Sequence, residues 1–541
     1  EEYFLPVVGS AAKLKSLLTA WGNVYRSPDL STDGDVKAMT NEGDYSVTNV
    51  QVQGIDEGDL VKTDGTYLYH IVSDKVLITL ARPAASLAIV REIHEEGFFP
   101  GALYVDSARL VVIGWQWVER DSEGEGDYRY MLPHQATCTR VLVYDLRDME
   151  SIRLIRDVSV DGYTVTSRKK DNYLYLVNCQ HTYRYSEDED LPLPCYKDSA
   201  AGGEDSIIGY DEIHYFPGGE ASDFIMLAAL DLEGGELKVE TYLGMAQNIY
   251  MSPDYLYLAL AEGAGTNTAV HRFSVGGAKI AYKGKGTVPG YPLNQFSMDE
   301  YQGYFRIATT DWQGESSQNN LFILDRDLKP AGELRGLAPG ESIYAARFMG
   351  ERGYLVTFET MDPLFALDLS DPRAPKVLGE LKIPGFSTYL HPLDSGHLLG
   401  IGQDTFLSQD GDREFVQTGG LKLAVFDVSD VKNPLEKQAI ILGDSGSWSE
   451  ALYDHKAVFF REGVLALPAV LTRQGGEALA FLGALFFELD GAMGIREMGR
   501  VSHISDPLSA EWPFWPAGEV RRIVQIGDTY YTLSDKKVMA H

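Results

Sequence analysis

Three carboxylates stand close together near the start of the chain, at Asp56, Glu57 and Asp59. Closely spaced carboxylates beside the carbonyl oxygens of a turn suit a hard cation such as Ca²⁺. The other interpretation is that these side chains shape the turn and accept hydrogen bonds from its backbone amides. A second acidic stretch, residues 409–414, lacks the ligand spacing of an EF-hand and is interpreted as an exposed hairpin tip.

Aromatic residues in or beside predicted loops are the second group that could act on a ligand. Aromatic rings stack on sugars or pack against a partner protein. The candidates for such a binding surface are Trp115, Trp117, Tyr128, Tyr130, Tyr183, Tyr185 and Tyr196. The alternative, which the sequence leaves open, is that these rings plug a face of the folded domain.

The chain has three cysteines, Cys138, Cys179 and Cys195. A disulfide between Cys179 and Cys195 would close a loop of about sixteen residues and stabilise the fold by roughly 3 kcal/mol. Two free thiols are the equally weighted alternative. No Cys-x-x-Cys pair occurs, so the sequence does not support a zinc or redox motif.

Sequence signatures of catalysis are missing. There is no His-Glu-x-x-His motif, phosphate-binding loop or dinucleotide fingerprint. Aspartates recur at one point of successive repeats, at Asp145, Asp231, Asp325, Asp368 and Asp427. Their regular placement favours hydrogen bonding within turns over catalysis, so no catalytic residue is assigned.

The composition limits the partners. The chain of 541 residues carries a formal net charge of −32, which disfavours nucleic acid and anionic membranes. No apolar stretch approaches the roughly 20 residues that a membrane helix needs. A hydrophobic content of 44% is ample for a packed core.

A repeated strand pattern is the main structural signal. Short runs such as Tyr67-Leu68-Tyr69 follow turn residues nine times along the chain, and a strand ending in Asp usually comes next. Four antiparallel strands per repeat predict an all-β fold, a β-propeller with nine blades; eight is the alternative count. A single blade leaves apolar faces exposed that neighbouring blades can cover.

Residues 1–44 lie outside the repeat and are predicted to form a short helix and an arm, followed by the propeller at 45–541. The ninth repeat lacks a fourth strand, which residues 50–52 could supply. Insertions at about 117–136 and 180–221 each fall between the second and third strands of a blade. We expect both to project from the same face, where propellers usually bind their ligands.

Residues 49–65, from Asn49 to Gly65, resemble the opening signature of a family of secreted proteins with a C-terminal β-propeller domain distantly related to WD repeats. Similar segments occur at residues 197–200, 215–217 and 420–430. The resemblance implies an exported or surface protein of bacteria or archaea and no established reaction.

These features together predict a secreted or cell-surface propeller that acts as a binding or scaffolding module, its signal peptide removed. Its expected partners are proteins or glycans, and it could self-assemble into a surface layer or filament, with the arm docking on a neighbour. The alternative is an extracellular hydrolase or lyase with paired carboxylates at the channel mouth, acting on polysaccharide or peptide.

Overall fold

The computed structural model describes residues 4–19, 43–119, 135–182, 193–219, 223–263, 266–314, 316–358, 362–410, 413–476, 478–489, 494–504 and 518–541. Internal contacts divide the chain into two compact units, which we describe separately. Unit 1 comprises Glu1–Pro28, Gly54–Gly263 and His271–Gly284, and unit 2 comprises Asp29–Gln53, Ala264–Val270 and Lys285–His541.

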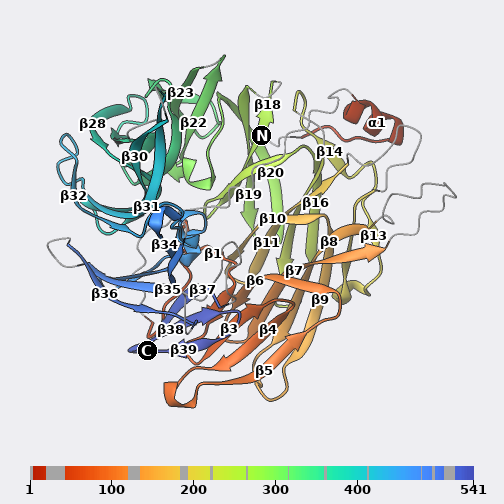
Figure 1. Cartoon of the computed structure of the whole chain (residues 1–541). Helices are drawn as coiled ribbons and strands as arrows, with labels where there is room; N and C mark the ends of the chain where they lie inside the picture. The colour runs from red at the N-terminus through yellow and green to blue at the C-terminus, as the bar shows by residue number, and fades with distance from the viewer. Residues whose placement is uncertain are drawn as a thin grey trace. The chain divides into compact units, whose positions relative to one another are not determined.

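The described residues form nine sheets, each built on consecutive antiparallel strands in chain order (Figure 1). Eight sheets contain a four-stranded meander, and the ninth has three strands. The chain is therefore a nine-bladed β-propeller, as the sequence predicted, and its last blade has three strands among the described residues.

Blades 1 to 3 belong to unit 1, and blade 4 contributes residues to both units. Blade 1 contains β2 (Val61–Thr63), β3 (Tyr67–Val72), β4 (Lys75–Leu80) and β5 (Ala88–His94). Blade 2 contains β6 (Phe98–Val105), β7 (Arg109–Glu119), β8 (Gln135–Asp145) and β9 (Arg153–Asp161). Blade 3 contains β10 (Tyr163–Lys170), β11 (Tyr173–His181), β15 (Asp223–Asp231) and β16 (Leu237–Leu243). Blade 4 contains β17 (Ala246–Met251), β18 (Tyr255–Glu262), β19 (Asn267–Gly276) and β20 (Lys279–Pro289).

Blades 5 to 9 belong to unit 2. Blade 5 contains β21 (Met298–Tyr301), β22 (Tyr304–Gln313), β23 (Ser316–Leu324) and β24 (Pro330–Leu337). Blade 6 contains β25 (Ser342–Met349), β26 (Arg352–Phe358), β27 (Asp362–Asp368) and β28 (Lys376–Ile383). Blade 7 contains β29 (Phe386–Pro392), β30 (His397–Asp410), β31 (Arg413–Asp427) and β32 (Leu435–Leu442). Blade 8 contains β33 (Phe459–Arg461), β34 (Val464–Arg473), β35 (Ala478–Leu489) and β36 (Ile495–Val501). Blade 9 contains β37 (Val520–Ile526), β38 (Thr529–Ser534) and β39 (Val538–Ala540).

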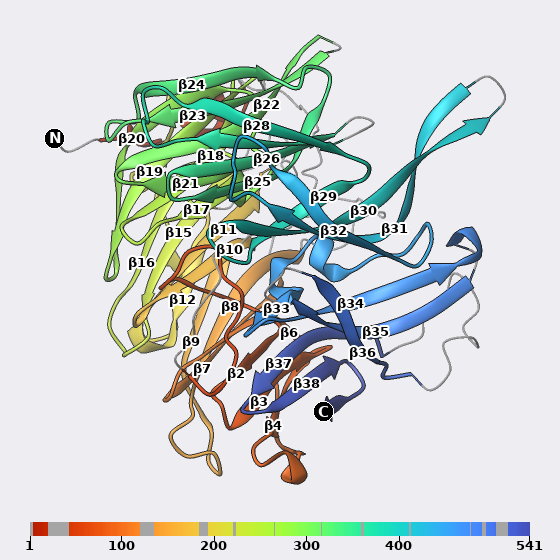
Figure 2. The same cartoon turned by 90° about the vertical axis from the view of Figure 1, so that its left-hand side faces the viewer.

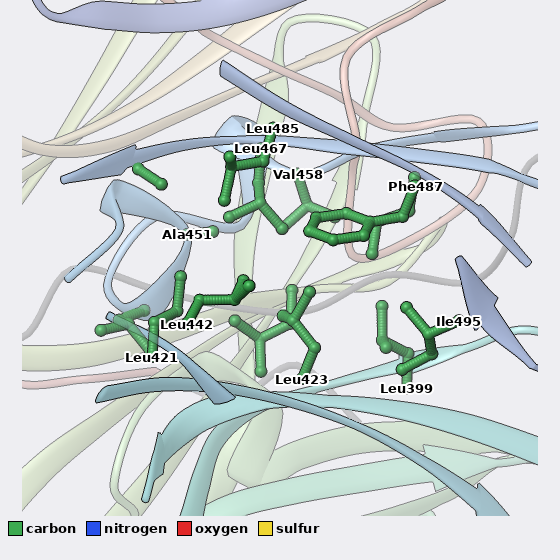
Figure 3. Close-up of a cluster of buried hydrophobic side chains, with 14 of the residues drawn as sticks. Leu399, Leu421, Leu423, Leu442, Ala451, Val458, Leu467, Leu485, Phe487 and Ile495 are labelled. Atoms are coloured by element: carbon green, nitrogen blue, oxygen red, sulfur yellow. The ribbon is translucent and has the colours of Figure 1, made fainter. Parts of the chain in front are cut away.

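The middle strands of the blades are buried on both faces, whereas the fourth strands are half exposed. All but the last residue of β15 is buried, and β28 alternates between half-buried and exposed positions. A strand covered on both faces reads as a continuous apolar run, which is why the repeats were visible in the sequence. Figure 3 shows the result in unit 2, where leucines and Phe487 of blades 7 and 8 form one core. Each fully buried side chain of this kind contributes about 1.5–3 kcal/mol.

The turns between the first and second strands of blades 5 and 8 each contain two consecutive residues with positive φ angles. Gln302 and Gly303 have φ angles of 52° and 80°, and Glu462 and Gly463 have φ angles of 53° and 80°. Two consecutive residues with positive φ make a type I′ turn, whose twist matches that of an antiparallel hairpin.

The sequence predicted that the second insertion projects from a face of the propeller. Its described part does not. Its described part returns along the outer edges of two blades of unit 1. There β12 (Cys195–Asp198) pairs with β9, β13 (Ser206–Ile207) pairs with β12, and β14 (Ile213–Tyr215) runs parallel to β16. The insertion thus covers the unpaired backbone groups that an outer strand would otherwise expose.

The predicted N-terminal helix, α1 (Ala11–Thr19), also lies in unit 1 (Figure 1). The preceding segment extends the sheet of blade 3, because Val7 forms a bridge with His214 and the Val8 amide donates to the Ile213 carbonyl at 2.8 Å. Leu14 anchors α1 in the core with 1% exposure. No helix in the described part of the chain is long and apolar enough to span a membrane.

Short 3₁₀ helices complete the described elements. They are η1 (Ala84–Ser86), η2 (Ser199–Ala201), η3 (Gln295–Ser297), η4 (Glu450–Leu452), η5 (His455–Ala457) and η6 (Gln474–Gly476). A further two-residue strand, β1 (Asp56–Glu57), pairs with β10 in unit 1.

The proposed closure by residues 50–52 is wrong, since these residues form no strand. Within unit 2, Tyr45 instead forms a bridge with Ile526 of β37, the strand of blade 9 farthest from β39. Backbone hydrogen bonds flank this bridge, from the Ser46 amide to the Gln525 carbonyl at 2.8 Å and from the Gly527 amide to the Asp44 carbonyl at 2.6 Å, and side chains add further contacts. The Asn49 amide donates to the Tyr389 hydroxyl at 3.0 Å and to the His455 carbonyl at 2.9 Å.

Candidate binding surface

An exposed group of aromatic rings lies at one end of blade 2, on the paired strands β6 and β7. Trp115 and Trp117 are two residues apart on β7 and therefore face the same side of the sheet. Phe99 of β6 stands directly opposite Trp115 in the strand register. The exposed fractions of Phe99, Trp115 and Trp117 are 37%, 37% and 49%. We call these three residues the aromatic patch.

The three rings of the aromatic patch are ordered against one another. Phe99 and Trp115 stack with their centroids 4.3 Å apart and their planes 16° from parallel. Trp117 meets Trp115 edge-on, at 5.4 Å and 86°. Both arrangements suit the quadrupoles of aromatic rings. The patch therefore presents large apolar surfaces whose positions are fixed by their neighbours.

The sheet beneath the patch is held rigidly. Gly114 allows the close approach of β6, because a Cβ atom there would lie 2.2 Å from the Phe99 carbonyl oxygen. On the other side of the strand pair, Arg140 lies over the ring of buried Phe98, 5.8 Å from its centroid. The guanidinium of Arg140 also binds Asp157 through two hydrogen bonds, which raise the pKa of Arg140.

Sequence reasoning identified Trp115 and Trp117 but placed them in or beside a loop, whereas both lie within β7. It missed Phe99, which only the strand register brings opposite Trp115. The signal available was the pair Phe98-Phe99 at the start of a predicted strand, where one ring must point outward.

The other predicted aromatic residues do not join the patch in the described structure. Tyr196 lies on β12, is half buried and packs against the core of unit 1. Tyr128, Tyr130, Tyr183 and Tyr185 lie outside the described residues.

The carboxylates proposed to bind Ca²⁺ contact protein groups in unit 1. Asp56 accepts a hydrogen bond from the Lys62 ammonium at 2.6 Å, and buried Glu57 lies 3.7 Å from the Arg168 guanidinium. Asp59 accepts from the Leu60 amide at 2.7 Å. Within the described ranges, no three His, Cys, Asp or Glu side chains gather as a metal site would require. The contact of Asp59 matches the turn-shaping interpretation, Asp56 and Glu57 lie beside cationic side chains instead, and Ca²⁺ binding stays a prediction.

The cysteines are free thiols, so the suggested disulfide between Cys179 and Cys195 is not formed. Cys179 is buried in β11 of blade 3, where burial and the charge of Asp223 raise its pKa to about 12. Cys195 lies on β12, which pairs with β9 of blade 2. Cys179 directly precedes the insertion and Cys195 lies within it, and the return path of the insertion places the two residues on different sheets.

The recurring aspartates bind turn backbone, in agreement with the prediction. Each accepts a hydrogen bond from the amide two residues further on, at 2.8–3.1 Å. The serine two residues after Asp368, and the one two residues after Asp427, also donates its hydroxyl to the carboxylate. These hydrogen bonds lower the pKa of both aspartates. These five carboxylates therefore serve as turn acceptors, a structural rather than a catalytic role.

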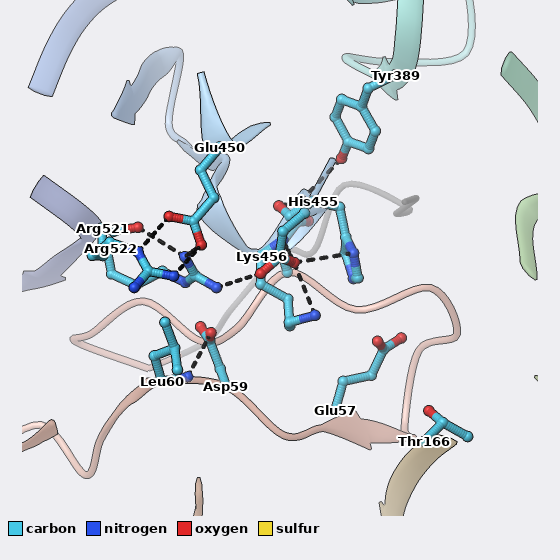
Figure 4. A network of polar contacts seen from close by, with 12 residues as sticks. Glu57, Asp59, Leu60, Thr166, Tyr389, Glu450, His455, Lys456, Arg521 and Arg522 are labelled. Atoms are coloured by element: carbon cyan, nitrogen blue, oxygen red, sulfur yellow. Dashed lines mark hydrogen bonds and ion pairs between the residues drawn. The ribbon is translucent and has the colours of Figure 1, made fainter. Parts of the chain in front are cut away.

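Unit 2 contains a polar network between the η4–η5 segment and β37 (Figure 4). Glu450 accepts two hydrogen bonds from Arg521 and one from Arg522, and Arg522 also donates to Asp454 at 2.5 Å. Burial opposes ionisation of Glu450, but Arg521 and Arg522 outweigh it and lower its pKa. Burial and the charge of Glu450 raise the pKa of the nearby Glu519.

His391, also in unit 2, lies in a buried aromatic setting. Its Nδ1 is 3.1 Å from the Tyr389 hydroxyl, and Phe460 meets the ring edge-on at 5.1 Å. Burial lowers the pKa of His391 to about 3, with the charges of Arg347 and His455 acting in the same direction. The imidazole is therefore neutral at physiological pH.

Comparison with known proteins identifies one family over most of the chain. The family described as "Beta propeller domain" matches residues 45–541. An uncharacterized protein of Methanocaldococcus jannaschii is 30% identical over 536 residues, covering 82% of this chain and 77% of that protein. An uncharacterized protein of Archaeoglobus fulgidus is 31% identical over 509 residues, covering 79% and 75%.

Among solved structures, a mutant of the Synechocystis apocarotenoid oxygenase matches 70% of this chain and 71% of its own, at 11% identity and a TM-score of 0.25. A likeness of that degree has no bearing on function.

Proposed function

Because the chain belongs to the Beta propeller domain family, we propose that it is a binding or scaffolding module that holds a partner on the aromatic patch of blade 2. The patch carries the proposal. Its three large rings touch one another and are 37–49% exposed, so they form a contiguous apolar surface of the kind that marks interaction sites, and aromatic anchors dominate the binding energy of protein interfaces.

We further propose that the protein works outside the cell or at its surface. The resemblance of residues 49–65 to secreted propeller proteins supports this location, and the net charge of −32 suits a protein that remains dispersed at high concentration. Self-assembly through the N-terminal arm is the weaker version, because Val7 and Val8 bond to β14 of the same chain.

The test is binding to immobilised panels of glycans and peptides, followed by titration of each positive ligand. A double variant, Trp115→Ala with Trp117→Ala, should weaken binding at least about tenfold because it removes the central anchors. The matched control is Trp312→Ala, since Trp312 is 57% exposed on blade 5. Equal affinity of the double variant and the control for every ligand would refute the patch as the binding site.

A hydrolase or lyase is the second candidate, favoured by the pair Glu450 and Glu519. Arg521 and Arg522 hold the Glu450 carboxylate by hydrogen bonds and lower its pKa, while the charge of Glu450 adds to burial in raising the pKa of Glu519, an arrangement found in pairs that act as base and acid. Incubation with polysaccharides and peptides should then release products, and Glu519→Gln should abolish the release. Absence of products with the intact protein would remove this candidate.

A further inference from the structure

We propose that the partner on the aromatic patch is a basic protein segment whose lysine and arginine side chains lie against the two tryptophan rings. This inference rests on the proposed function, because it assumes that the patch is the binding site. It adds the chemical class of the ligand, a cationic peptide.

The geometry of the patch suits a cation. Tryptophan is the strongest cation-binding aromatic side chain, and the edge-on contact of Trp117 with Trp115 gives two ring faces set nearly at right angles. A cation in the angle between them can contact both faces. The chain already uses such contacts internally, with Arg272 over Tyr255 at 4.7 Å and Arg306 over Tyr301 at 5.0 Å.

Among the described residues close to the patch, Arg140 is a cation that is committed elsewhere. Arg140 lies over Phe98, which belongs to the opposite side of the strand pair, and its guanidinium is held by both oxygens of Asp157. Its positive charge is therefore balanced within the blade and is not available to the tryptophan rings.

Charge complementarity favours the same class of partner. Glu96 is exposed in the turn immediately before β6, whereas Glu95 accepts a hydrogen bond from the Tyr144 hydroxyl at 3.2 Å. Because Phe98 pairs with Gln116, this acidic turn lies at the end of the strand pair where Trp117 stands. The net charge of −32 further attracts cations over long distances and repels acidic partners.

A neutral sugar fits the patch less well. Sugar recognition combines ring stacking with polar groups that bind the hydroxyls. Thr139, which pairs with Trp115 across the strands, is buried, and its hydroxyl already contacts the Gly162 carbonyl at 3.2 Å and the Thr164 hydroxyl at 2.9 Å. The patch is thus rich in ring faces, and this neighbouring hydroxyl is already satisfied within the protein.

The experiment measures the affinity of the full chain for a fluorescent ten-residue oligolysine, a Gly-Ser peptide of equal length and a neutral glucan oligosaccharide. Oligolysine should bind and the two neutral probes should not. The Trp115→Ala, Trp117→Ala double variant should lose about five- to thirty-fold in affinity, whereas Trp312→Ala should lose none. Trp117→Phe should fall between, because phenylalanine keeps a weaker ring face. Far-ultraviolet circular dichroism and the melting curve check that each variant is folded.

Two controls separate the contributions of charge and rings. Glu96→Gln should weaken oligolysine binding by a small factor that disappears at high salt, since screening removes an exposed charge. Oligolysine binding that is unchanged in the double tryptophan variant would mean attraction to net charge alone and would overturn this inference. Glucan binding that is lost in the double variant would also overturn it while leaving the patch as a binding site. If the tryptophan substitutions change neither the binding of any probe nor the binding to the glycan and peptide panels, both proposals are overturned.

Discussion

Unit 1 contains two groups of aromatic side chains that differ in their exposure to water. In the patch, Phe99, Trp115 and Trp117 are 37–49% exposed. In the second group Phe216, Tyr242 and Phe273 are at most 4% exposed, and the rings pack at 5.2–5.4 Å. Tyr242 belongs to β16, the fourth strand of blade 3, which would normally face solvent. It is buried between Phe216, on the insertion that returns over that blade, and Phe273 of β19.

The difference shows what decides the role of a ring in this fold. Both groups use large aromatic side chains on or beside strands, so residue type does not distinguish them. What distinguishes them within the described residues is that the insertion of blade 3 returns over one group, whereas no described segment covers the other. A covered group stabilises the fold, and an uncovered one is free to meet a partner.

The largest effect should come from removing the covering ring. Phe216→Ala should lower the free energy of unfolding by about 3–5 kcal/mol, because it empties space between rings that cannot collapse fully. The matched control is Phe99→Ala at an exposed phenylalanine, which should cost less than about 1 kcal/mol. Urea unfolding followed by circular dichroism measures both, and equal costs would contradict the comparison.

A smaller effect is expected at the base of the patch. Gly114→Ala should destabilise the protein by about 1–3 kcal/mol and disturb the stack of Phe99 on Trp115, since the new Cβ would meet the Phe99 carbonyl. Thermal melting measures the loss of stability, and tryptophan fluorescence reports the change in the stack. An unaltered spectrum together with full stability would show that β6 and β7 can separate freely.

Buried rings that could carry charge should make stability depend on pH. His391 has a pKa of about 3 in the folded protein against 6.5 in the unfolded chain, so the unfolded state binds the additional proton between these values. Stability should therefore be unaffected by His391 above pH 6.5 and fall by about 1.4 kcal/mol per pH unit below it.

His391→Phe should remove this contribution and flatten the curve of unfolding free energy against pH. His503, whose pKa burial lowers to about 4, should account for part of the remaining slope. An identical slope in the parent protein and in His391→Phe would show that His391 is accessible to protons in the folded state.

The smallest effect on stability is expected at the patch itself. Trp117→Ala should change the free energy of unfolding by no more than about 0.5 kcal/mol, because the side chain is already half in water. Its effect on partner binding should nevertheless be large. A substantial loss of stability would assign Trp117 to the core and remove the contrast between the two groups.

Much of the fold could be predicted from the sequence because each blade repeats one pattern of turn, buried strand and aspartate-ended strand. The run Leu174 to Val177 is apolar throughout because both faces of its strand are covered. The aspartates were correctly assigned to turns for the same reason, since Asp231 and Asp368 recur at equivalent positions. The residue types and their spacing were sufficient to predict both the buried strands and the turn aspartates.

The path of the insertion and the composition of the patch could not be predicted, because both depend on pairings between distant residues. Nothing near Cys195 indicates that its strand pairs with β9, and this pairing separates Cys195 from Cys179. Phe99 becomes part of the patch only through its register with Trp115. The contacts of Asn49 are likewise invisible in sequence, since its partners lie 340 and 406 residues away.

The last of these separations has a consequence for synthesis of the chain. A ribosome adds about 5–20 residues per second, so His455 emerges roughly 20–80 s after Asn49. The backbone amide of Gln525 donates to the Ser46 hydroxyl, and Gln525 lies 479 residues after Ser46. Blades 1 to 3 can therefore form while residues 43–51 still lack their partners. The polar Asn49 and Gln51 would keep residues 43–51 hydrated during this time. The nascent protein would be most vulnerable to mispairing with other chains until its last blades have been made.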